Sequence, residues 1–298
     1  MHEKLTTEAV NPKSADLDRL DTLELVRLIN AEDATVAAAV AAQSEAIARA
    51  VDIIAERLAG GGRLVYVGAG TSGRLGVLDA SECPPTFSAD PGQVIGLIAG
   101  GDVALRNAVE GAEDSRQAAI DDLRSIALSA DDALVGITAS GTAPYVVAAL
   151  DEARAVGAAA IALTCNADSL AEAHADLAIA VVVGPEVLAG STRLKAGTAT
   201  KLVLNTLTTG AMVRLGKTYG NLMVDLQASN TKLVARSRRI LQQLTDLDAD
   251  AADALLARCD GELKTAIVVA RLGIDVDAAR QRLADAGGRL RIALGDDA

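Results

Sequence analysis

Five short apolar runs, separated by segments with a helical pattern, restrict the folds open to this chain more than any other feature. The runs occupy 63–67, 93–98, 133–138, 159–164 and 177–183. They are almost continuously apolar rather than alternating, which is typical of strands buried on both faces of a parallel sheet. The predicted fold class is therefore α/β, with a doubly wound parallel five-stranded sheet.

Helical patterns fill the rest of the chain. Between and after the strands, helices are expected at about 73–83, 112–126, 143–156, 169–175 and 196–215. Ahead of the first strand, we predict a short helix at 22–29 and a long one at 33–58, which the glycines at 60–62 would stop. Beyond residue 224 only helices are expected, near 225–243, 249–258, 262–271 and 276–286. Asp248, Asp260 and Asp275 are plausible N-caps of these last helices. The predicted domains are a helical lead-in at 1–44, the α/β domain at 45–223 and a small helical bundle at 224–298.

The charge and composition of the chain exclude several classes of function. The formal net charge is −12, so nucleic acid and anionic membranes are poor partners. Residues 1–11 are polar, and no run of about 18 apolar residues suggests a membrane span. The chain has two His and three widely spaced Cys, which is poor material for a metal site. We therefore expect a cytoplasmic protein that holds no metal.

A glycine-rich loop follows the first predicted strand, where residues 68–74 read GAGTSGR. The spacing G-x-G-x-x-G also occurs in dinucleotide-binding loops, but by itself it is weak support for that function. Thr71 and Ser72 place hydroxyl groups at the turn, and no acidic residue follows about 20 positions later to hold a ribose. Gly70, Thr71 and Ser72 are thus predicted to bind a phosphomonoester rather than NAD. The alternative is that the glycines only permit a tight turn.

A second loop of the same kind follows the third predicted strand. Residues 138–144 read TASGTAP, and the proline suits the first turn of a helix. Because ligands of open α/β sheets bind at the carboxyl ends of the strands, Ser140 and Thr142 should face the same crevice as Ser72. Each loop alone could be a plain helix cap, but together they predict phosphate binding.

Two glutamates are candidates for acid–base chemistry. Glu82 precedes two prolines that should end its helix at Cys83, and the dipole at a helix C-terminus favours the protonated acid. Glu113 is expected near a helix start, where a carboxylate is favoured as an anion and can act as a base. These opposite environments are typical of an acid–base pair. A solvated glutamate at a frayed helix end remains the alternative for Glu82.

A third polar segment follows the last predicted strand. It includes Glu186, Ser191 and Lys195 just before a helix. These three residues could complete a sugar-phosphate pocket or could form a contact between subunits. A solvated lysine is an equally good interpretation of Lys195.

These motifs together resemble the N-acetylmuramic acid 6-phosphate etherases, a branch of the sugar isomerase (SIS) domain proteins. The resemblance covers essentially the whole chain and rests on the glycine-rich loop, on LDASECPPT at 78–86, on AVEGAED at 108–114, and on 191–201 and 220–225. One departure lies in the second loop, where Thr142 stands in place of an Arg in some relatives. That substitution leaves the phosphate donors of this loop open.

The resemblance implies an enzyme without a metal or organic cofactor. Such an enzyme would eliminate D-lactate from N-acetylmuramate 6-phosphate and hydrate the unsaturated sugar to N-acetylglucosamine 6-phosphate. Glu82 matches the family's acid, and Glu113 matches its second catalytic carboxylate. The resemblance also implies a homodimer and a C-terminal bundle similar to ubiquitin-associated domains. The alternatives are a sugar-phosphate-sensing regulator and an aldose–ketose isomerase of the same fold, neither of which accounts well for the segment around Glu82.

Overall fold

The computed structural model describes residues 5–226 and 231–296. The chain divides into two compact units, the first formed by 1–81 with 92–208 and the second by 82–91 with 209–298. These limits differ from the domain boundaries expected from the sequence, at 44/45 and 223/224. No helix in the described part of the chain is both long and apolar enough to cross a membrane.

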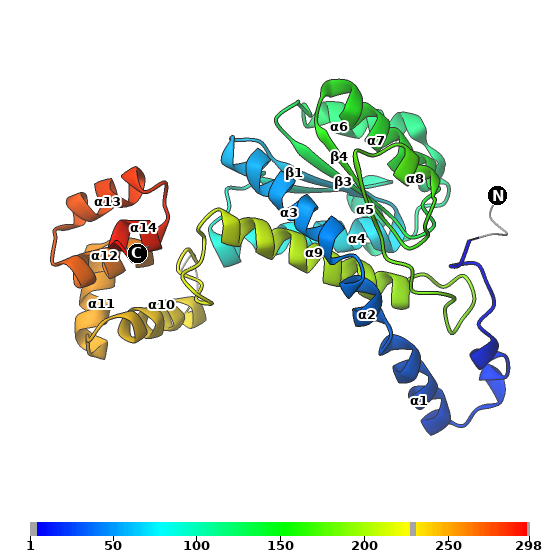
Figure 1. The fold of residues 1–298 in the computed structure, drawn as a ribbon, viewed down its shortest axis with the longest axis horizontal. Helices are drawn as coiled ribbons and strands as arrows, with labels where there is room; N and C mark the ends of the chain where they lie inside the picture. The colour runs from blue at the N-terminus through cyan, green and yellow to red at the C-terminus, as the bar shows by residue number, and fades with distance from the viewer. Residues whose placement is uncertain (1–4, 227–230, 297–298) are drawn as a thin grey trace. The chain divides into compact units, whose positions relative to one another are not determined.

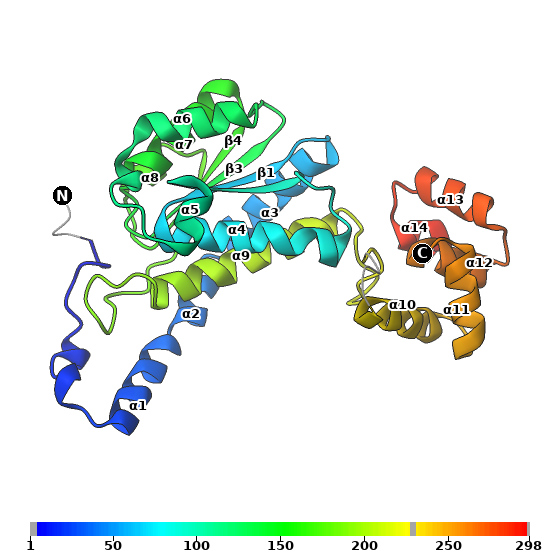
Figure 2. The same cartoon turned by 180° about the vertical axis from the view of Figure 1, so that it is seen from behind.

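The first unit is built on a parallel sheet of five strands (Figures 1 and 2). Its strand order is β2-β1-β3-β4-β5. The strands are β1 (Leu64–Gly68), β2 (Val94–Ile98), β3 (Ala133–Thr138), β4 (Ala159–Thr164) and β5 (Leu177–Ala180). The prediction of a doubly wound α/β fold is therefore confirmed. The fifth strand ends at Ala180, three residues earlier than predicted.

Helices cover both faces of this sheet, which explains why its strands are apolar throughout. Figure 1 shows α6 and α7 on one face and α3, α4 and α9 on the other. Gly136 of β3 contacts α7 so closely that a Cβ there would lie 2.9 Å from Val146, and a Cβ on Gly96 of β2 would lie 2.6 Å from Val77 of α4. These helices are α3 (Ser44–Ala59), α4 (Gly70–Phe87), α6 (Arg116–Ser125), α7 (Pro144–Val156) and α9 (Lys195–Arg214). Two shorter helices, α5 (Gly101–Arg106) and α8 (Leu170–Ala173), follow β2 and β4.

Helix α4 corrects the prediction that Pro84 and Pro85 end it at Cys83. The helix continues through both prolines to Phe87, and the Ser88 N–H still donates to the Pro84 carbonyl at 3.0 Å. Proline fits helical φ and costs mainly the hydrogen bond that its missing N–H would make. Cys83 and Phe87 are both buried and lie one turn apart. We attribute the extra turn to this burial, which offsets the lost bonds.

The long helix predicted for 33–58 is also wrong. The chain instead forms α1 (Thr22–Asp33), α2 (Val36–Ala41) and α3, with turns between them. At the end of α2 the Ala42 N–H is shared between the carbonyls of Ala38 and Val40, which is the tightened geometry of a helix end. The end of α3 at Ala59, followed by Gly60, is as predicted.

The described helices of the second unit enclose a separate apolar core, in which Leu241, Cys259, Ala266 and Ile267 are fully buried. They are α10 (Thr231–Leu244), α11 (Ala249–Arg258), α12 (Leu263–Leu272), α13 (Val276–Asp285) and α14 (Leu290–Leu294). The predicted helix at 225–243 includes 227–230, which lie outside the described residues. The sequence pattern did not predict α14.

Two of the three proposed N-caps in this unit are confirmed. The carboxylates of Asp248 and Asp275 accept hydrogen bonds from the N–H groups of Ala251 and Ala278 at 2.8 Å. Asp260 is not a cap, since Glu262 occupies that position of α12 and Asp260 instead pairs with Arg280 at 2.7 Å.

Candidate active site

The glycine-rich loop turns directly from β1 into α4. The helix begins at Gly70, three residues earlier than predicted, so Thr71 and Ser72 lie in its first turn. Gly68 and Gly73 contact each other closely, because a Cβ on Gly73 would lie 2.6 Å from the Gly68 carbonyl oxygen. Two of the glycines thus allow close packing, while the N–H groups of the first turn of α4 remain free for an anion.

The second loop is held open by its own hydroxyl groups. Ser140 Oγ lies 3.0 Å from Thr142 Oγ1 and 3.4 Å from Thr138 Oγ1. Gly141 has φ of +74° and is packed so tightly on Ser169 that a Cβ would lie 2.3 Å from the serine Cβ. No larger residue fits at this turn, so the glycine fixes the path of the loop and the placement of the hydroxyls on either side.

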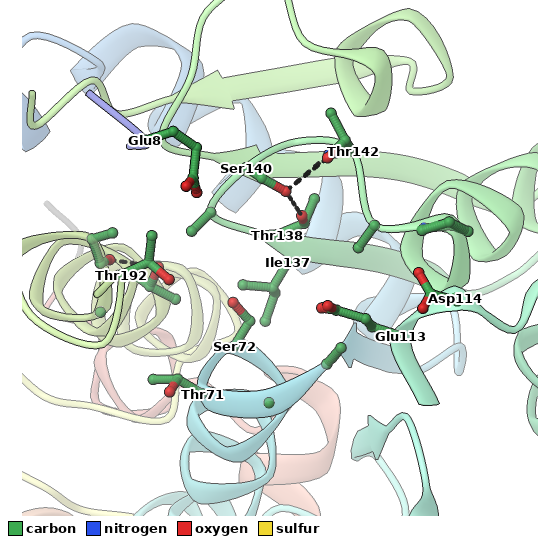
Figure 3. Close-up of a pocket in the computed structure, with 18 residues that line it drawn as sticks. Glu8, Thr71, Ser72, Glu113, Asp114, Ile137, Thr138, Ser140, Thr142 and Thr192 are labelled. Carbon is green, nitrogen blue, oxygen red and sulfur yellow. Dashed lines mark hydrogen bonds between the residues drawn. The ribbon is translucent and has the colours of Figure 1, made fainter. Parts of the chain in front are cut away.

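A cavity of about 430 Å³ lies at the carboxyl ends of β1 and β3, where the two loops meet. Figure 3 shows the hydroxyl groups of Ser72, Thr138 and Ser140 near its centre. The predicted residues Gly70, Thr71, Ser72, Glu113, Ser140 and Thr142 all line it. The other lining residues are Glu8, Ala69, Asp114, Ile137, Thr138, Ala139, Ala143, Pro144, Thr192, Ala196, Gly197 and Thr200.

The polar groups of the cavity wall are hydroxyls, backbone amides and carboxylates. Within the described chain, no Lys, Arg or His lines it. A phosphate bound here would therefore be held by Ser and Thr hydroxyls and by the free N–H groups at the start of α4. The three carboxylates of the wall belong to Glu8, Glu113 and Asp114. Among the described residues, no group of His, Cys, Asp and Glu is arranged to hold a metal ion.

Glu113 reaches the cavity from a short turn that precedes α6. This turn, the 3₁₀ helix Ala112–Asp114, leads into Ser115, whose Oγ accepts a hydrogen bond from the Ala118 N–H at 3.2 Å and so caps α6. The Glu113 carboxylate points toward the hydroxyl groups of the two loops (Figure 3). The expected position near a helix start is thus confirmed. The side chain is exposed, and the described residues supply it with no hydrogen bond or ion pair.

Glu82 and Glu113 do not line the same cavity. Glu82 is not among the residues that line the cavity, and its side chain is exposed on α4. Since α4 runs on to Phe87, Glu82 precedes the last turn, and the argument from the dipole at a helix end no longer applies to it. The neighbouring apolar residue one turn earlier, Leu78, is also 45% exposed.

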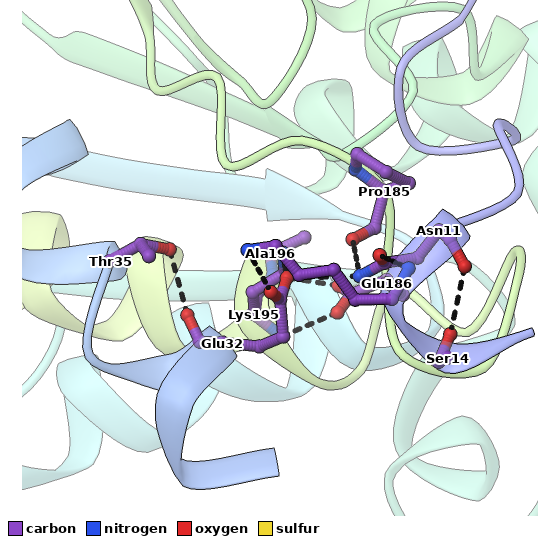
Figure 4. A network of polar contacts seen from close by, with 9 residues as sticks. Asn11, Ser14, Glu32, Thr35, Pro185, Glu186, Lys195 and Ala196 are labelled. Atoms are coloured by element: carbon purple, nitrogen blue, oxygen red, sulfur yellow. Dashed lines mark hydrogen bonds and ion pairs between the residues drawn. The ribbon is translucent and has the colours of Figure 1, made fainter. Parts of the chain in front are cut away.

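Glu186 and Lys195 are taken up by partners inside the protein, which corrects their proposed place in the pocket. The Glu186 carboxylate accepts hydrogen bonds from the N–H groups of Lys195 and Ala196, at 2.9 and 3.0 Å, and so caps α9. The Lys195 ammonium is buried and pairs with Glu32 at 2.7 Å (Figure 4). Both side chains are bonded to partners inside the protein, and neither lines the cavity.

The ion pair at Glu32 is part of a larger buried network (Figure 4). Glu32 also accepts hydrogen bonds from Lys13 at 2.8 Å and from Asn11 at 3.0 Å. The bonds from Lys13 and Lys195, with the charge of Lys195, lower the pKa of Glu32 to about 2 against the opposing effect of burial. This network sets the position of the N-terminus of α9, whose next residues line the cavity.

The sequence predicted Ser191 at the cavity, where its neighbour Thr192 is found, and did not predict two other lining residues. Ser191 does not line the cavity, but its neighbour Thr192 does, because 188–194 form turns and only the second of the two hydroxyls faces inward. Glu8 and Thr200 were not predicted at all. No sequence pattern links Thr200, which lies inside α9, or Glu8, which lies near the start of the chain, to the glycine-rich loop.

Comparisons with known proteins identify a SIS domain in this chain. A model of the glucokinase regulatory protein N-terminal SIS domain matches residues 46–154, and a SIS domain model matches 115–210. The structure of a phosphoheptose isomerase from Francisella tularensis is similar, with a TM-score of 0.53 and 21% identity, and covers 65% of this chain and 100% of the isomerase.

Full-length relatives are more closely similar in sequence. The N-acetylmuramic acid 6-phosphate etherase of Streptomyces avermitilis is 58% identical, with 98% of this chain and 94% of the relative covered. The etherase of Rhodopirellula baltica is 57% identical, with 96% and 95% covered. That of Mycolicibacterium smegmatis is 54% identical, with 98% of each chain covered.

Proposed function

The chain belongs to the N-acetylmuramic acid 6-phosphate etherase family, and we propose from this premise that it is a carbon–oxygen lyase acting on N-acetylmuramate 6-phosphate. The reaction cleaves the D-lactyl ether and gives N-acetylglucosamine 6-phosphate and D-lactate. The observation that supports it most strongly is the cavity itself, in which two hydroxyl-rich loops face the Glu113 carboxylate, a group that no described residue pairs with.

The loops bind the 6-phosphate in this proposal. Thr71 and Ser72 lie in the first turn of α4, whose free N–H groups and dipole favour an anion. Ser140 and Thr142 provide further hydroxyls from the opposite loop. Since no described residue of the wall is a cation, neutral hydrogen-bond donors rather than ion pairs are the phosphate ligands in this proposal.

Glu113 acts as the base. Its carboxylate removes the proton from C2 of the sugar, a C2–C3 double bond forms, and the C3–O bond to lactate breaks. Water then adds to the unsaturated sugar, placing its hydroxyl on C3 and its proton on C2. A general base needs an ionised carboxylate within hydrogen-bond reach of the proton, and Glu113 is an exposed carboxylate that faces the cavity.

Glu82 acts as the acid that protonates the departing lactate oxygen, and we propose that it acts in the cavity of a partner subunit. It does not line the cavity of its own chain. Leu78 and Glu82, four residues apart on α4, share one exposed face. Exposed apolar side chains also occur on α1 at Leu23 and on α9 at Leu202. A second copy that covers the exposed face of α4 at Leu78 and Glu82 would form a homodimer and would desolvate Glu82, which favours the protonated acid.

Mixing two variants tests this shared site. Glu82→Gln and Glu113→Gln should each lose most lactate release. If the two carboxylates come from different subunits, half of the randomly mixed dimers carry one intact site, so refolding the variants together should restore about a quarter of wild-type activity. Mixtures of either variant with itself serve as controls. No recovery in the mixture would contradict the shared site.

Two further measurements test the reaction. Wild-type protein should release D-lactate from N-acetylmuramate 6-phosphate, and background release would disprove the etherase proposal. Solvent deuterium should enter C2 in Glu82→Gln but not in Glu113→Gln, since only Glu113 is proposed to remove that proton.

The alternatives predict other outcomes. An aldose–ketose isomerase would interconvert sugar phosphates without releasing lactate, and a sugar-phosphate-sensing regulator would bind them without turnover. The match to a glucokinase regulatory protein domain favours sugar-phosphate binding of some kind, but the relatives that span the whole chain are named etherases.

We place the reaction in the cytoplasm, because a charged sugar phosphate does not cross a membrane unaided.

A further inference from the structure

The N-terminal strap, defined here as residues 5–14, passes the cavity and is fixed first beside its second loop. The Thr6 N–H and hydroxyl both donate to Asn166 Oδ1, at 2.7 and 2.8 Å. Asn166 Nδ2 donates to Thr7 Oγ1 at 3.0 Å and to the carbonyl of Ala139 at 2.9 Å. Thr7 and Asn166 are buried. One side chain therefore ties the strap to the residue that precedes Ser140.

The strap is fixed a second time at Asn11. Its amide donates to Glu32 at 3.0 Å and to the Pro185 carbonyl at 3.4 Å, and it is buried (Figure 4). Glu32 in turn pairs with Lys195 at the start of α9. Since the two anchors lie only four residues apart along the strap, the backbone between them has little freedom.

Glu8 lies between these anchors, and its side chain lines the cavity. Figure 3 shows it on the side of Ser140 and Thr192, away from Thr71 and Glu113. Gly190 lies beside it, since a Cβ on that residue would be in van der Waals contact with Glu8 Oε2 at 3.4 Å. In the described portion of the molecule, no hydrogen bond or ion pair engages the carboxylate. The strap thus holds an unpaired acceptor at one end of the cavity.

The chemistry of this group restricts what it can bind. An ionised carboxylate accepts hydrogen bonds and donates none, and it repels phosphate. Of the hydroxyls proposed to bind phosphate, Thr71 at the start of α4 lies away from Glu8, whereas Ser140 of the second loop lies on its side of the cavity (Figure 3). A sugar phosphate held by its phosphate at the start of α4 would therefore present its ring, with its hydroxyl and acetamido N–H donors, to the far end of the cavity.

We propose that Glu8 is a substrate-binding residue that accepts a hydrogen bond from a donor on the sugar ring and so selects amino-sugar phosphates by their ring rather than by their phosphate. This inference rests on the proposed function for the identity of the ligand. It assigns to the start of the chain a recognition role that is separate from the acid–base pair.

Direct binding of N-acetylglucosamine 6-phosphate and of inorganic phosphate, measured by calorimetry, tests the proposal. Glu8→Ala should weaken binding of the sugar phosphate by about 10- to 100-fold, as expected for a lost hydrogen bond to a charged group. Binding of inorganic phosphate should not change. Glu8→Gln keeps an uncharged acceptor and should weaken the sugar phosphate by only about three- to tenfold.

Val10→Ala is the matched control, because Val10 lies on the same strap, is 73% exposed and does not line the cavity. It should bind both ligands like the wild type. The proposal is overturned if Glu8→Ala binds the sugar phosphate normally, or if it weakens inorganic phosphate to the same extent, which would show that the strap only supports the phosphate loops.

The donor can be identified with 2-deoxyglucose 6-phosphate, which has no donor at C2. If the effect of Glu8→Ala disappears with this ligand, the partner is the acetamido N–H. If the effect persists, the partner is a ring hydroxyl. These binding measurements need no turnover, so a wild-type protein that binds N-acetylglucosamine 6-phosphate but releases no lactate would refute the etherase reaction and leave the role of Glu8 open to the same test.

Discussion

The carboxylates that line the cavity and the buried carboxylates near the start of α9 differ in their exposure and in their hydrogen-bond partners. Glu8 and Glu113 are exposed at the cavity wall, and the described residues give them no partner. Glu32 and Glu186 are buried, and each accepts at least two hydrogen bonds. The first pair is free to act on a ligand, whereas the second pair is committed to holding the chain together.

This difference shows that partners, rather than residue type, separate a candidate catalytic group from a structural one. Glu186 stands in a segment rich in hydroxyls and cations, which is typical of an active-site carboxylate, yet two backbone N–H groups donate hydrogen bonds to it. A buried charge must be paired because burial without a partner is costly. An exposed one need not be paired and can be kept for chemistry.

The largest expected effect is the loss of turnover in Glu113→Gln. Loss of a general base typically lowers turnover by about 10²- to 10⁴-fold. The thermal midpoint should stay near that of the wild type, because no described contact depends on this carboxylate. Asp114→Asn, a change in the adjacent carboxylate that also lines the cavity, is the control and should retain most activity. Equal losses in both variants would refute the assignment of Glu113 as the base.

The next largest effect should be a loss of stability in Lys195→Met. This change leaves Glu32 buried without its closest cation, which costs roughly 3 kcal/mol of unfolding free energy. Denaturant unfolding should show the loss. The double variant Glu32→Met/Lys195→Met should recover part of it, because no unpaired charge remains. A double variant less stable than the single one would show that the ion pair is not the reason.

The same network around Glu32 predicts that the stability of the fold depends on pH in the acid range. The folded protein holds the pKa of Glu32 near 2, below its ordinary value of 4.5, chiefly through hydrogen bonds from Lys13 and Lys195. A lowered pKa contributes stability that is present above pH 4.5 and is lost as the pH falls toward 2. The shift corresponds to roughly 3 kcal/mol. Thermal melts should show a shallower acid limb in Glu32→Gln than in the wild type, and identical slopes would contradict this.

The smallest expected effect is the loss of stability in Lys13→Met. Lys13 contacts the same carboxylate as Lys195, but its side chain is 67% exposed, so solvent already screens its charge. We expect a loss of about 0 to 1 kcal/mol, typical of exposed ion pairs. Thermal melts at low and at high salt would measure it. A loss as large as that of Lys195→Met would mean that burial does not distinguish the two lysines.

The sheet and the loops that follow its strands could be predicted because their signals are local. A continuously apolar run of strand length identifies a buried strand, and a glycine-rich turn after it identifies a crevice at its carboxyl end. Gly70, Thr71, Ser72, Ser140, Thr142 and Glu113 all reached the cavity for this reason. Each follows a strand or precedes a helix in the part of the fold where sequence order fixes spatial order.

The remaining site residues could not be predicted because their positions depend on distant contacts. Glu8 reaches the cavity through Asn166, which lies about 160 residues away. Lys195 leaves it because Glu32, 163 residues away, captures its ammonium. Glu82 stays outside because α4, which begins at the cavity with Gly70, carries it away from the two loops. Such competition between partners has no signature within a short window of sequence.

The sequence by itself determined the parallel sheet and the two hydroxyl-rich loops, since these follow from apolar runs and from residues adjacent in the chain, and its motifs carried the resemblance to the family. Tertiary structure alone decided which carboxylates remain available for a ligand. Whether a glutamate is paired depends on what other segments bring within about 3 Å of it, and at that distance a hydrogen bond or an ion pair either forms or does not.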